Sequence, residues 1–460
     1  MMIDRTIHII RRQKLDVSFR DGRKGLGLPH ELSLLFRERI APLLDIVLEE
    51  MDRPGYFIRL DQLTLDVGSL PSKGWDRLLP ERVVKLFREE LQRQLQLVAR
   101  SDREELEEGE QGWEDGPRAA WHSLLRFLAT GALTGWGGLT TLPALEERVL
   151  ETLCLPHPST WRLRLARQLA EEPVFLERFL LQLTPSFHES LLEWMGYGDQ
   201  RISIDISGSV QLDPVIRGRL ETLLRLWQGL SLQEPMQLYY LDAPGVVLEK
   251  MIAGHRDPTL ERELRRLLPK GTVMLRDPEE RRRSLPGAEL SEEDGIYIGN
   301  AGLVLLHPFL SSFMSELGLA DNAGRWHDPV SQERGCWLTQ YLVGGQTELE
   351  EPDIVLNKLL CGYPVDQPVE RYWEPSATEQ AETQRLLEQV ITYWTALKNT
   401  SVEGLRANFL QRAGKLQRRG DVWLLQVEQK TWDVLLGMLP WGIGQIKNQW
   451  MEERLVVEWA

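Results

Sequence analysis

The sequence predicts an α+β fold that is predominantly α-helical, and three observations support this prediction. Apolar residues recur at helical spacing through most of the chain, alternation at period two is concentrated towards the two ends, and 42% of the 460 residues are hydrophobic. A chain of this length and composition can bury two or three cores rather than one. We predict a small αβ N-terminal unit, a helical middle, and a helical C-terminal domain that ends in a small antiparallel sheet.

Five segments are predicted along the chain. They are an N-terminal strand-helix-strand unit over 1–70, a long helix and acidic linker over 71–116, a helical middle region over 117–275, a charged linker over 276–295, and a C-terminal domain over 296–460. The two linkers are assigned from their charge, because segments dense in charge bury too little apolar surface to form a core.

The N-terminal unit begins with alternating apolar residues over 15–19, followed by apolar residues at helical spacing. A second strand is predicted over 56–67, where the apolar phase slips by one residue and a β-bulge at residues 61–62 would absorb the slip. Pro42 lies within the intervening helix. Because proline lacks an N–H and its ring clashes with the preceding turn, we expect a bend near Arg39 in a single helix.

Helices are predicted through the rest of the chain until its last 50 residues. The longest runs from Trp75 to Glu107, with Pro80 in its first turns, and leads into an acidic stretch over 101–116 in which eight of sixteen residues are Asp or Glu. In the middle region we predict helices over 121–133, 142–154, 159–184, 215–227 and 258–268, and a short β-like segment over 201–213. Short helices this close in sequence are expected to pack as antiparallel neighbours.

Strand character returns near the C-terminal end. Thr400 and Glu403 have capping-box spacing and should start a helix over 401–413. The following residues predict a β-hairpin around Gly420 and Asp421, and residues 454–459 alternate well enough to join the same sheet.

The charge and the cysteines exclude several classes of protein. The formal net charge is −15, which opposes binding to nucleic acid or to an anionic membrane surface. Three cysteines without a CxxC pair predict neither a disulfide framework nor a thiolate metal site. The first residues do not resemble a signal peptide, and the longest apolar stretch, 301–310, is too short to cross a bilayer. We expect a cytoplasmic chain without nucleic-acid partners or membrane insertion.

No enzyme signature is found in the sequence. It contains no GxSxG nucleophile elbow, no HExxH zinc helix and no phosphate-binding loop, and no two histidines have the spacing of metal ligands on one helix face. We therefore predict a protein that is not an enzyme and that needs no metal or cofactor. A cytoplasmic hydrolase with a noncontiguous site remains an alternative.

Tryptophan is concentrated in the C-terminal part, where seven of the sixteen lie at or after Trp373. Alternation predicts that Trp423 and Trp459 are buried in the sheet. Trp441 and Trp450 lie in a segment broken by proline and glycine, so we predict that they bind a partner, since tryptophan is enriched at binding hot spots.

Several long phrases resemble one family. They are "IHIIRRQKLDVSF" at 7–19, "IRLDQLTLDVGSL" at 58–70, "GNAGLVLLHPF" at 299–309, "VLNKLLCG" at 355–362, "WTALKNTS" at 394–401 and "LPWGIGQIK" at 439–447. Together they resemble the contractile injection system tape measure protein family. Within these phrases, Asn300, Asn357 and Lys358 are further candidates for contact with a partner.

The resemblance implies a non-enzymatic assembly protein of a phage-tail-like particle, in which a sheath contracts around a rigid inner tube. A tape measure protein limits the length of tube and sheath, so the expected partners are inner-tube and baseplate proteins, with self-association in several copies. The expected location is the cytoplasm during assembly and the injection particle afterwards. The alternative within this class is a baseplate-associated scaffold or a chaperone for tube subunits.

Overall fold

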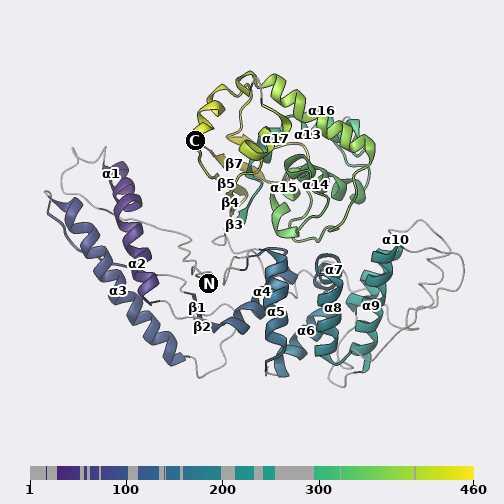
Figure 1. The fold of residues 1–460 in the computed structure, drawn as a ribbon, viewed down its shortest axis with the longest axis horizontal. Helices are drawn as coiled ribbons and strands as arrows, with labels where there is room; N and C mark the ends of the chain where they lie inside the picture. Colours follow the sequence, from purple (N-terminus) through teal and green to yellow (C-terminus); the bar gives the residue numbers. More distant parts are fainter. Residues whose placement is uncertain are drawn as a thin grey trace, which may run out of the picture. The chain divides into compact units, whose positions relative to one another are not determined.

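A computed structural model describes the chain over residues 17, 28–51, 56–59, 63–71, 74–101, 112–133, 139, 141–155, 159–197, 213–232, 242–253, 295–321, 323–397 and 400–459 (Figure 1). The fold is predominantly helical with a small five-stranded sheet near the C-terminal end, which confirms the predicted class. The described residues divide into two compact units, one ending at His122 and the other beginning at Ser123. The charged linker over 276–295 lies outside the described residues except for Gly295, so the boundary there stays a prediction.

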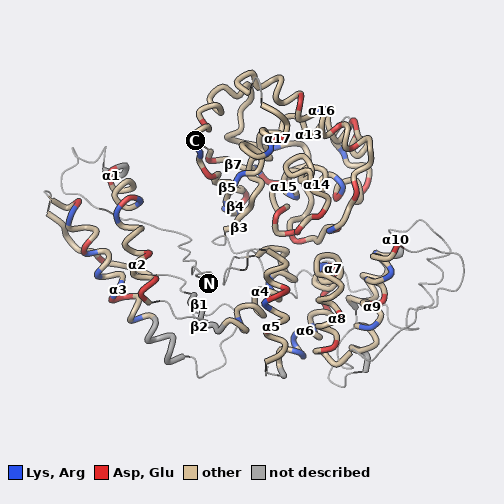
Figure 2. The backbone as a smooth tube through the Cα atoms, viewed as in Figure 1, with Lys and Arg blue, Asp and Glu red and all other residues tan. Residues whose placement is uncertain are grey.

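The helices of the first unit pack around one apolar cluster. They are α1 (Leu28–Leu35), a π-helical segment (Phe36–Ile40), α2 (Ala41–Met51) and α3 (Trp75–Ser101). The N–H of Ala41 bonds to the carbonyl of Phe36, five residues back, directly before Pro42. The π-helical segment contains Arg39, the residue at which the sequence predicts a bend in one helix. Both charge signs lie along these helices (Figure 2), and Arg88 of α3 pairs with Glu50 of α2 at 2.6 Å.

The predicted second strand is only half correct. Strand β1 (Tyr56–Arg59) pairs antiparallel with β2 (Gly112–Asp115), whereas residues 63–70 form no regular structure. The alternation in 63–67 is nevertheless real, because Leu63, Leu65 and Val67 pack on the helical cluster while the residues between them are exposed. The buried side of this segment therefore packs on helices, and the segment does not pair with a strand.

Strand β2 lies within the acidic stretch over 101–116, where Gly112–Asp115 supplies the backbone partner of β1, and the linker assigned to this stretch stays a prediction. The strand predicted over 15–19 lies outside the described residues apart from Val17.

The second unit begins with a series of helices (Figure 1), with α4 crossing the boundary between units. They are α4 (Gly116–Thr130), α5 (Leu142–Leu153), α6 (Ser159–Glu171), α7 (Pro173–Gln182), α8 (Pro185–Met195), α9 (Pro214–Leu232) and α10 (Asp242–Ala253). The prediction of a single helix over 159–184 is wrong, because α6 ends at Glu171 and a new helix, α7, begins at Pro173. The segments predicted over 201–213 and 258–268 lie outside the described residues except for Asp213.

The C-terminal domain surrounds one large core whose described members all lie between Ile296 and Trp459. Its helices are α13 (Leu310–Glu316), α14 (Pro329–Gly344), α15 (Val355–Cys361), α16 (Ala377–Tyr393) and α17 (Val402–Leu405), with 3-10 segments at Ala301–Leu306, Glu351–Ile354, Thr395–Leu397 and Thr431–Met438 and a π-helical segment at Arg406–Leu410. Ser401, rather than the predicted Thr400, caps α17, because its Oγ accepts the N–H of Gly404 at 3.1 Å.

The sheet has the order β3-β4-β5-β7-β6. Its strands are β3 (Ile296–Ile298), β4 (Gly414–Arg419), β5 (Val422–Val427), β6 (Gln445–Ile446) and β7 (Arg454–Glu458). The predicted hairpin is confirmed, with Gly420 at a φ of +58° in its turn. The sheet is mixed rather than wholly antiparallel, because β5 and β7 pair in parallel and residues 428–453 form the long crossover that such a pair requires.

Candidate partner-binding surface

Two of the predicted contact residues, Asn300 and Asn357, are buried together inside the C-terminal domain. The Nδ2 of Asn300 donates to the Oδ1 of Asn357 at 2.6 Å and to the carbonyl of Asp353 at 2.8 Å. The Nδ2 of Asn357 donates to the Oγ1 of Thr339 at 2.9 Å. These bonds join the start of the 3-10 segment Ala301–Leu306 to α14 and α15. In this conformation both side chains bond to residues of the same domain. Their contact with a partner therefore stays a prediction.

Lys358 is buried as well, at 1% exposure, and its Nζ donates to the Oε1 of Glu351 at 2.5 Å. Arg178 of α7 binds the other oxygen of that carboxylate at 2.9 Å. Burial alone would raise the pKa of Glu351, but the two cations outweigh it and hold the pKa below its usual value. Burial lowers the pKa of Lys358 despite its carboxylate partner. In this conformation Lys358 serves an internal ion cluster, and its contact with a partner also stays a prediction.

The two predicted tryptophans differ in their surroundings. Trp450 is 9% exposed and packs against Trp326, with ring centroids 4.7 Å apart. Trp441 is half-buried, donates its Nε1 to the carbonyl of Leu305 at 3.0 Å, and meets Phe309 edge-on at 5.0 Å. Trp441 therefore lies at the edge of the core, beside exposed side chains.

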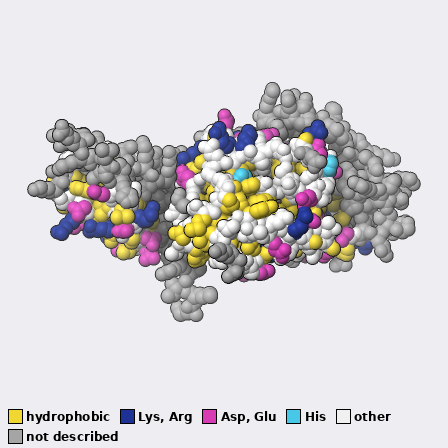
Figure 3. Space-filling model, turned by 90° about the horizontal axis from the view of Figure 1, so that it is seen from above, with side chains coloured by type: hydrophobic (Ala, Val, Ile, Leu, Met, Phe, Trp, Pro, Cys, Tyr) yellow, Lys and Arg dark blue, Asp and Glu magenta, His cyan; other side chains and the backbone are white. Residues whose placement is uncertain are grey.

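We call the apolar surface the set made of the half-buried Phe309 and Trp441 and the exposed Tyr393, Trp432, Val434 and Met438. The exposed fractions of Val434 and Met438 are 75% and 65%, and Tyr393 is 59% exposed. Figure 3 shows hydrophobic side chains gathered on a face of the C-terminal domain. Large exposed apolar groups that lie together are typical of protein-binding sites.

Short-range contacts hold the apolar surface in place. Phe309 stacks on Tyr393 at 6.0 Å and contacts Trp441, so it joins the end of α16 to the segment after the last 3-10 turn. The Nε1 of Trp394 donates to the carbonyl of Leu435 at 3.2 Å. Asp433 is the one ionisable residue in 431–446, and it is buried. The exposed part of this segment is therefore uncharged on a chain of net charge −15.

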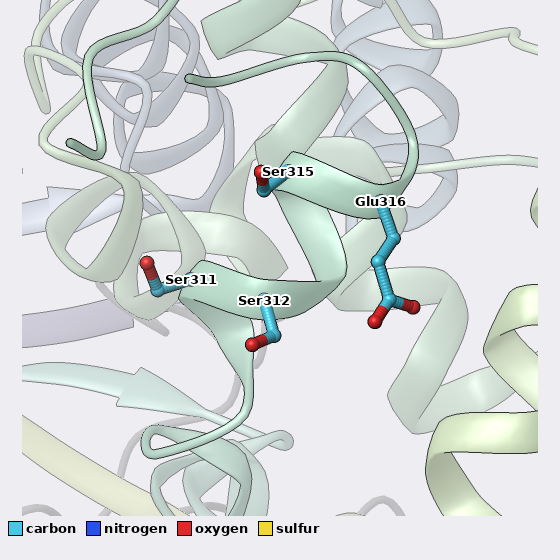
Figure 4. A pocket seen from close by; sticks show the side chains of 4 residues that line it. All are labelled: Ser311, Ser312, Ser315 and Glu316. Atoms are coloured by element: carbon cyan, nitrogen blue, oxygen red, sulfur yellow. The ribbon is translucent and has the colours of Figure 1, made fainter. Parts of the chain in front are cut away.

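A groove between α13 and α16 adjoins the apolar surface at Phe309 and Tyr393. It measures about 220 Å³ and is floored by apolar side chains that include Phe313 and Leu386. At its rim Arg385 pairs with both Glu316 and Glu382. A second pocket on α13 is lined by Ser311, Ser312, Ser315 and Glu316 (Figure 4). The first groove can accept an apolar side chain of a partner, whereas the second offers hydroxyl groups and one carboxylate.

One feature of the sequence indicates the apolar surface. The segment Thr431–Met438 is apolar on nearly all sides, which a helix with one buried face is not. Val434 and Met438 were missed because the tryptophans drew the prediction to Trp441 and Trp450. Tyr393 and Phe309 come from distant parts of the sequence, so their proximity needed the fold.

These features of the described residues indicate the class of protein to which the chain belongs. Among the described residues no group of three or more His, Cys, Asp or Glu side chains could hold a metal ion. No helix in the described part of the chain has both the length and the apolar character to span a membrane. The prominent site is an exposed apolar surface on a folded helical domain, and this is the character of a protein that binds other proteins.

The comparison with protein families is specific. Residues 7–459 match the family described as contractile injection system tape measure protein, and the chain therefore belongs to this family. Its members are structural assembly proteins that sit in the injection particle with tube components. No curated protein and no solved structure matches the chain.

Proposed function

We propose that the chain acts as the tape measure of a contractile injection particle and limits the length of the inner tube and sheath. The observation that carries the proposal is the family match over residues 7–459. We further propose that the chain is cytoplasmic during assembly and lies within the particle afterwards, with inner-tube and baseplate subunits as its partners.

The dimensions of the fold bear on how length would be set. The longest described helix, α3, has 27 residues and spans about 40 Å, whereas all 460 residues in one helix would span about 690 Å. A ruler that works by contour length therefore requires part of the chain to extend. We expect the C-terminal domain to be the part that stays folded, because the described members of its core all come from the domain itself.

The test is the length distribution of sheathed particles, measured by electron microscopy. We would delete residues 260–289, outside the described core, and in a second strain duplicate the same 30 residues. A ruler predicts shorter and longer particles respectively, by up to roughly 45 Å if the segment is helical and roughly 100 Å if it is extended. Particles of unchanged length in both strains would contradict the ruler.

The apolar surface is proposed as the docking site for an inner-tube or baseplate subunit. Val434→Glu and Met438→Glu place a charge on this surface, and Val330→Glu is the matched control because Val330 is 59% exposed on α14. We expect at least a tenfold loss of affinity for the purified subunit with the first two variants and none with the control. Equal affinity in all three would remove the apolar surface from the proposal.

The same surface favours a second candidate, a baseplate-associated scaffold or chaperone for tube subunits. Such a protein would bind free tube subunits through exposed apolar side chains and keep them soluble. The two roles separate in the experiments above. A scaffold predicts insoluble tube protein with Val434→Glu and unchanged particle length with the deletion.

A further inference from the structure

The helical middle and the C-terminal domain meet through buried polar side chains. Arg178 of α7 donates from Nε to Oε2 of Glu351 at 2.9 Å, while Lys358 donates to Oε1 of the same carboxylate. Arg178, Glu351 and Lys358 are each at most 1% exposed. We call these three residues, together with Gln182 and Arg371, the latch.

Gln182 and Arg371 add further bonds across the same boundary. Gln182 of α7 donates from Nε2 to the carbonyl of Val369 at 2.7 Å and accepts the backbone N–H of Glu351 at 3.1 Å. Arg371 donates to the carbonyl of Gln182 at 2.5 Å. At the periphery, Arg219 of α9 pairs with Glu370 at 2.6 Å.

Among the described residues, the apolar core cluster of the C-terminal domain takes no member from the helical middle. The described members of this cluster lie between Ile296 and Trp459. Water can replace hydrogen bonds and ion pairs when two surfaces separate, so their net contribution is modest compared with that of buried apolar area. A boundary made of such bonds is therefore suited to opening.

The charges of the latch also permit separation. When the two parts are together, two cations share one carboxylate. If α7 moves away, Glu351 keeps Lys358, whose Nζ also donates to the carbonyls of Val365 and Gln367, and Arg178 enters water. Neither side is left with a buried unpaired charge, which is the costly outcome when an ion pair breaks.

We propose that the helical middle, Ser123–Ala253, is a detachable module, and that the bond between Arg178 and Glu351 sets the balance between its docked and undocked states. The C-terminal domain stays folded in both. Undocking would free the middle to extend along a tube. Extension along a tube rests on the proposed function. Undocking is a property of the isolated chain and is tested without particles.

The test is a distance distribution between two spin labels, measured by pulsed electron paramagnetic resonance on the purified full chain. Labels at Glu193→Cys on α8 and Gln384→Cys on α16 occupy exposed positions, in a Cys154→Ser background because Cys154 is exposed. We expect one narrow distance in the parent chain. Arg178→Ala should raise the separated fraction at least tenfold, and Arg178→Lys should give an intermediate value.

The matched control is Arg167→Ala, which truncates an arginine paired with Glu171 on the surface of α6. It should leave the distance distribution unchanged. Calorimetry of the same variants shows whether they remain folded, and Arg178→Ala should split unfolding into two transitions with that of the C-terminal domain retained. A single narrow distance in Arg178→Ala, or loss of the C-terminal transition together with the middle, would overturn the proposal.

Discussion

Arg412 and Asp433 form a buried bidentate ion pair that fixes the apolar surface to the sheet. The two nitrogens Nη2 and Nη1 lie 2.8 and 3.2 Å from Oδ1 and Oδ2. The same carboxylate accepts the indole N–H of Trp459 at 3.1 Å and the backbone N–H of Lys430 at 2.8 Å. Asp433 therefore holds the start of the exposed 3-10 segment against the residue that follows β7.

Asp433→Asn should destabilise the C-terminal domain by about 3–5 kcal/mol, because it leaves the Arg412 charge buried without its counter-ion. Urea denaturation measures this loss of unfolding free energy. Glu453→Gln is the control, since Glu453 pairs with Arg418 near the surface and should change stability by less than about 1 kcal/mol. Equal effects of the two substitutions would contradict the assigned role of Asp433.

Two glycines of the phrase at 299–309 should respond differently to alanine. A Cβ on Gly302 would lie 1.8 Å from the carbonyl oxygen of Phe409, so the backbone must move, at a cost of about 1–3 kcal/mol or more. A Cβ on Gly299 would meet no heavy atom within 4 Å. Thermal unfolding should show a clear fall in melting temperature for Gly302→Ala only, and similar values for both variants would refute the close approach.

Glu333 should make the stability of the second unit fall as the pH rises from about 4.5 to about 7. Burial, with smaller contributions from the charges of Glu370 and Glu177, raises its pKa from 4.5 to about 7, despite the N–H of Glu370 and the charge of Lys358, which lower it. A raised carboxyl pKa favours the protonated form in the folded state. Its contribution is therefore complete below pH 4.5 and is lost as the pH rises through about 7.

Glu333→Gln keeps an oxygen for the N–H of Glu370 and removes the charge. We expect the variant to be more stable than the parent at pH 8.5 by a few kcal/mol at most, because each unit of pKa shift corresponds to about 1.4 kcal/mol. At pH 5 the two should nearly agree. Urea denaturation at both pH values is the measurement, and parallel pH profiles would show that Glu333 does not titrate in this way.

The three cysteines should differ in reactivity. Cys154 is exposed, whereas Cys336 and Cys361 are buried, and burial raises the pKa of the Cys336 thiol well above its usual value. A chromogenic disulfide reagent should therefore titrate one thiol in the native chain and three in denaturant. Cys154→Ser should abolish the native reaction, and a second reactive native thiol would show that α14 and α15 open readily.

The hairpin at Gly420 and the burial of Trp423 and Trp459 could be predicted from sequence, because short-range alternation and turn chemistry determine them. Residues 63–67 alternate equally well, yet they pack on helices, since alternation reports one buried face and not what covers it. The parallel pairing of β5 and β7 depends on the route of a long crossover, which periodicity does not encode.

The site was less accessible to prediction than the fold. Lys358 was predicted to contact a partner, but its Nζ binds Glu351 inside the chain, and the other cation on that carboxylate, Arg178, is distant in sequence and belongs to another helix. The tryptophan pattern led to Trp441, at the edge of the apolar surface, but gave no means of separating it from the buried Trp450. Exposure is a property of the assembled domain, so Val434 and Met438 became visible only in the structure.

The position of β7 has a consequence for synthesis. This strand lies between β5 and β6, so the sheet of the C-terminal domain has a gap at its interior until Arg454–Glu458 have left the ribosome. A nascent chain that already carries β3, β4 and β5 still cannot close this core. The helices of the middle can therefore fold during synthesis, whereas the domain that bears the apolar surface completes its fold only after β7 has been made.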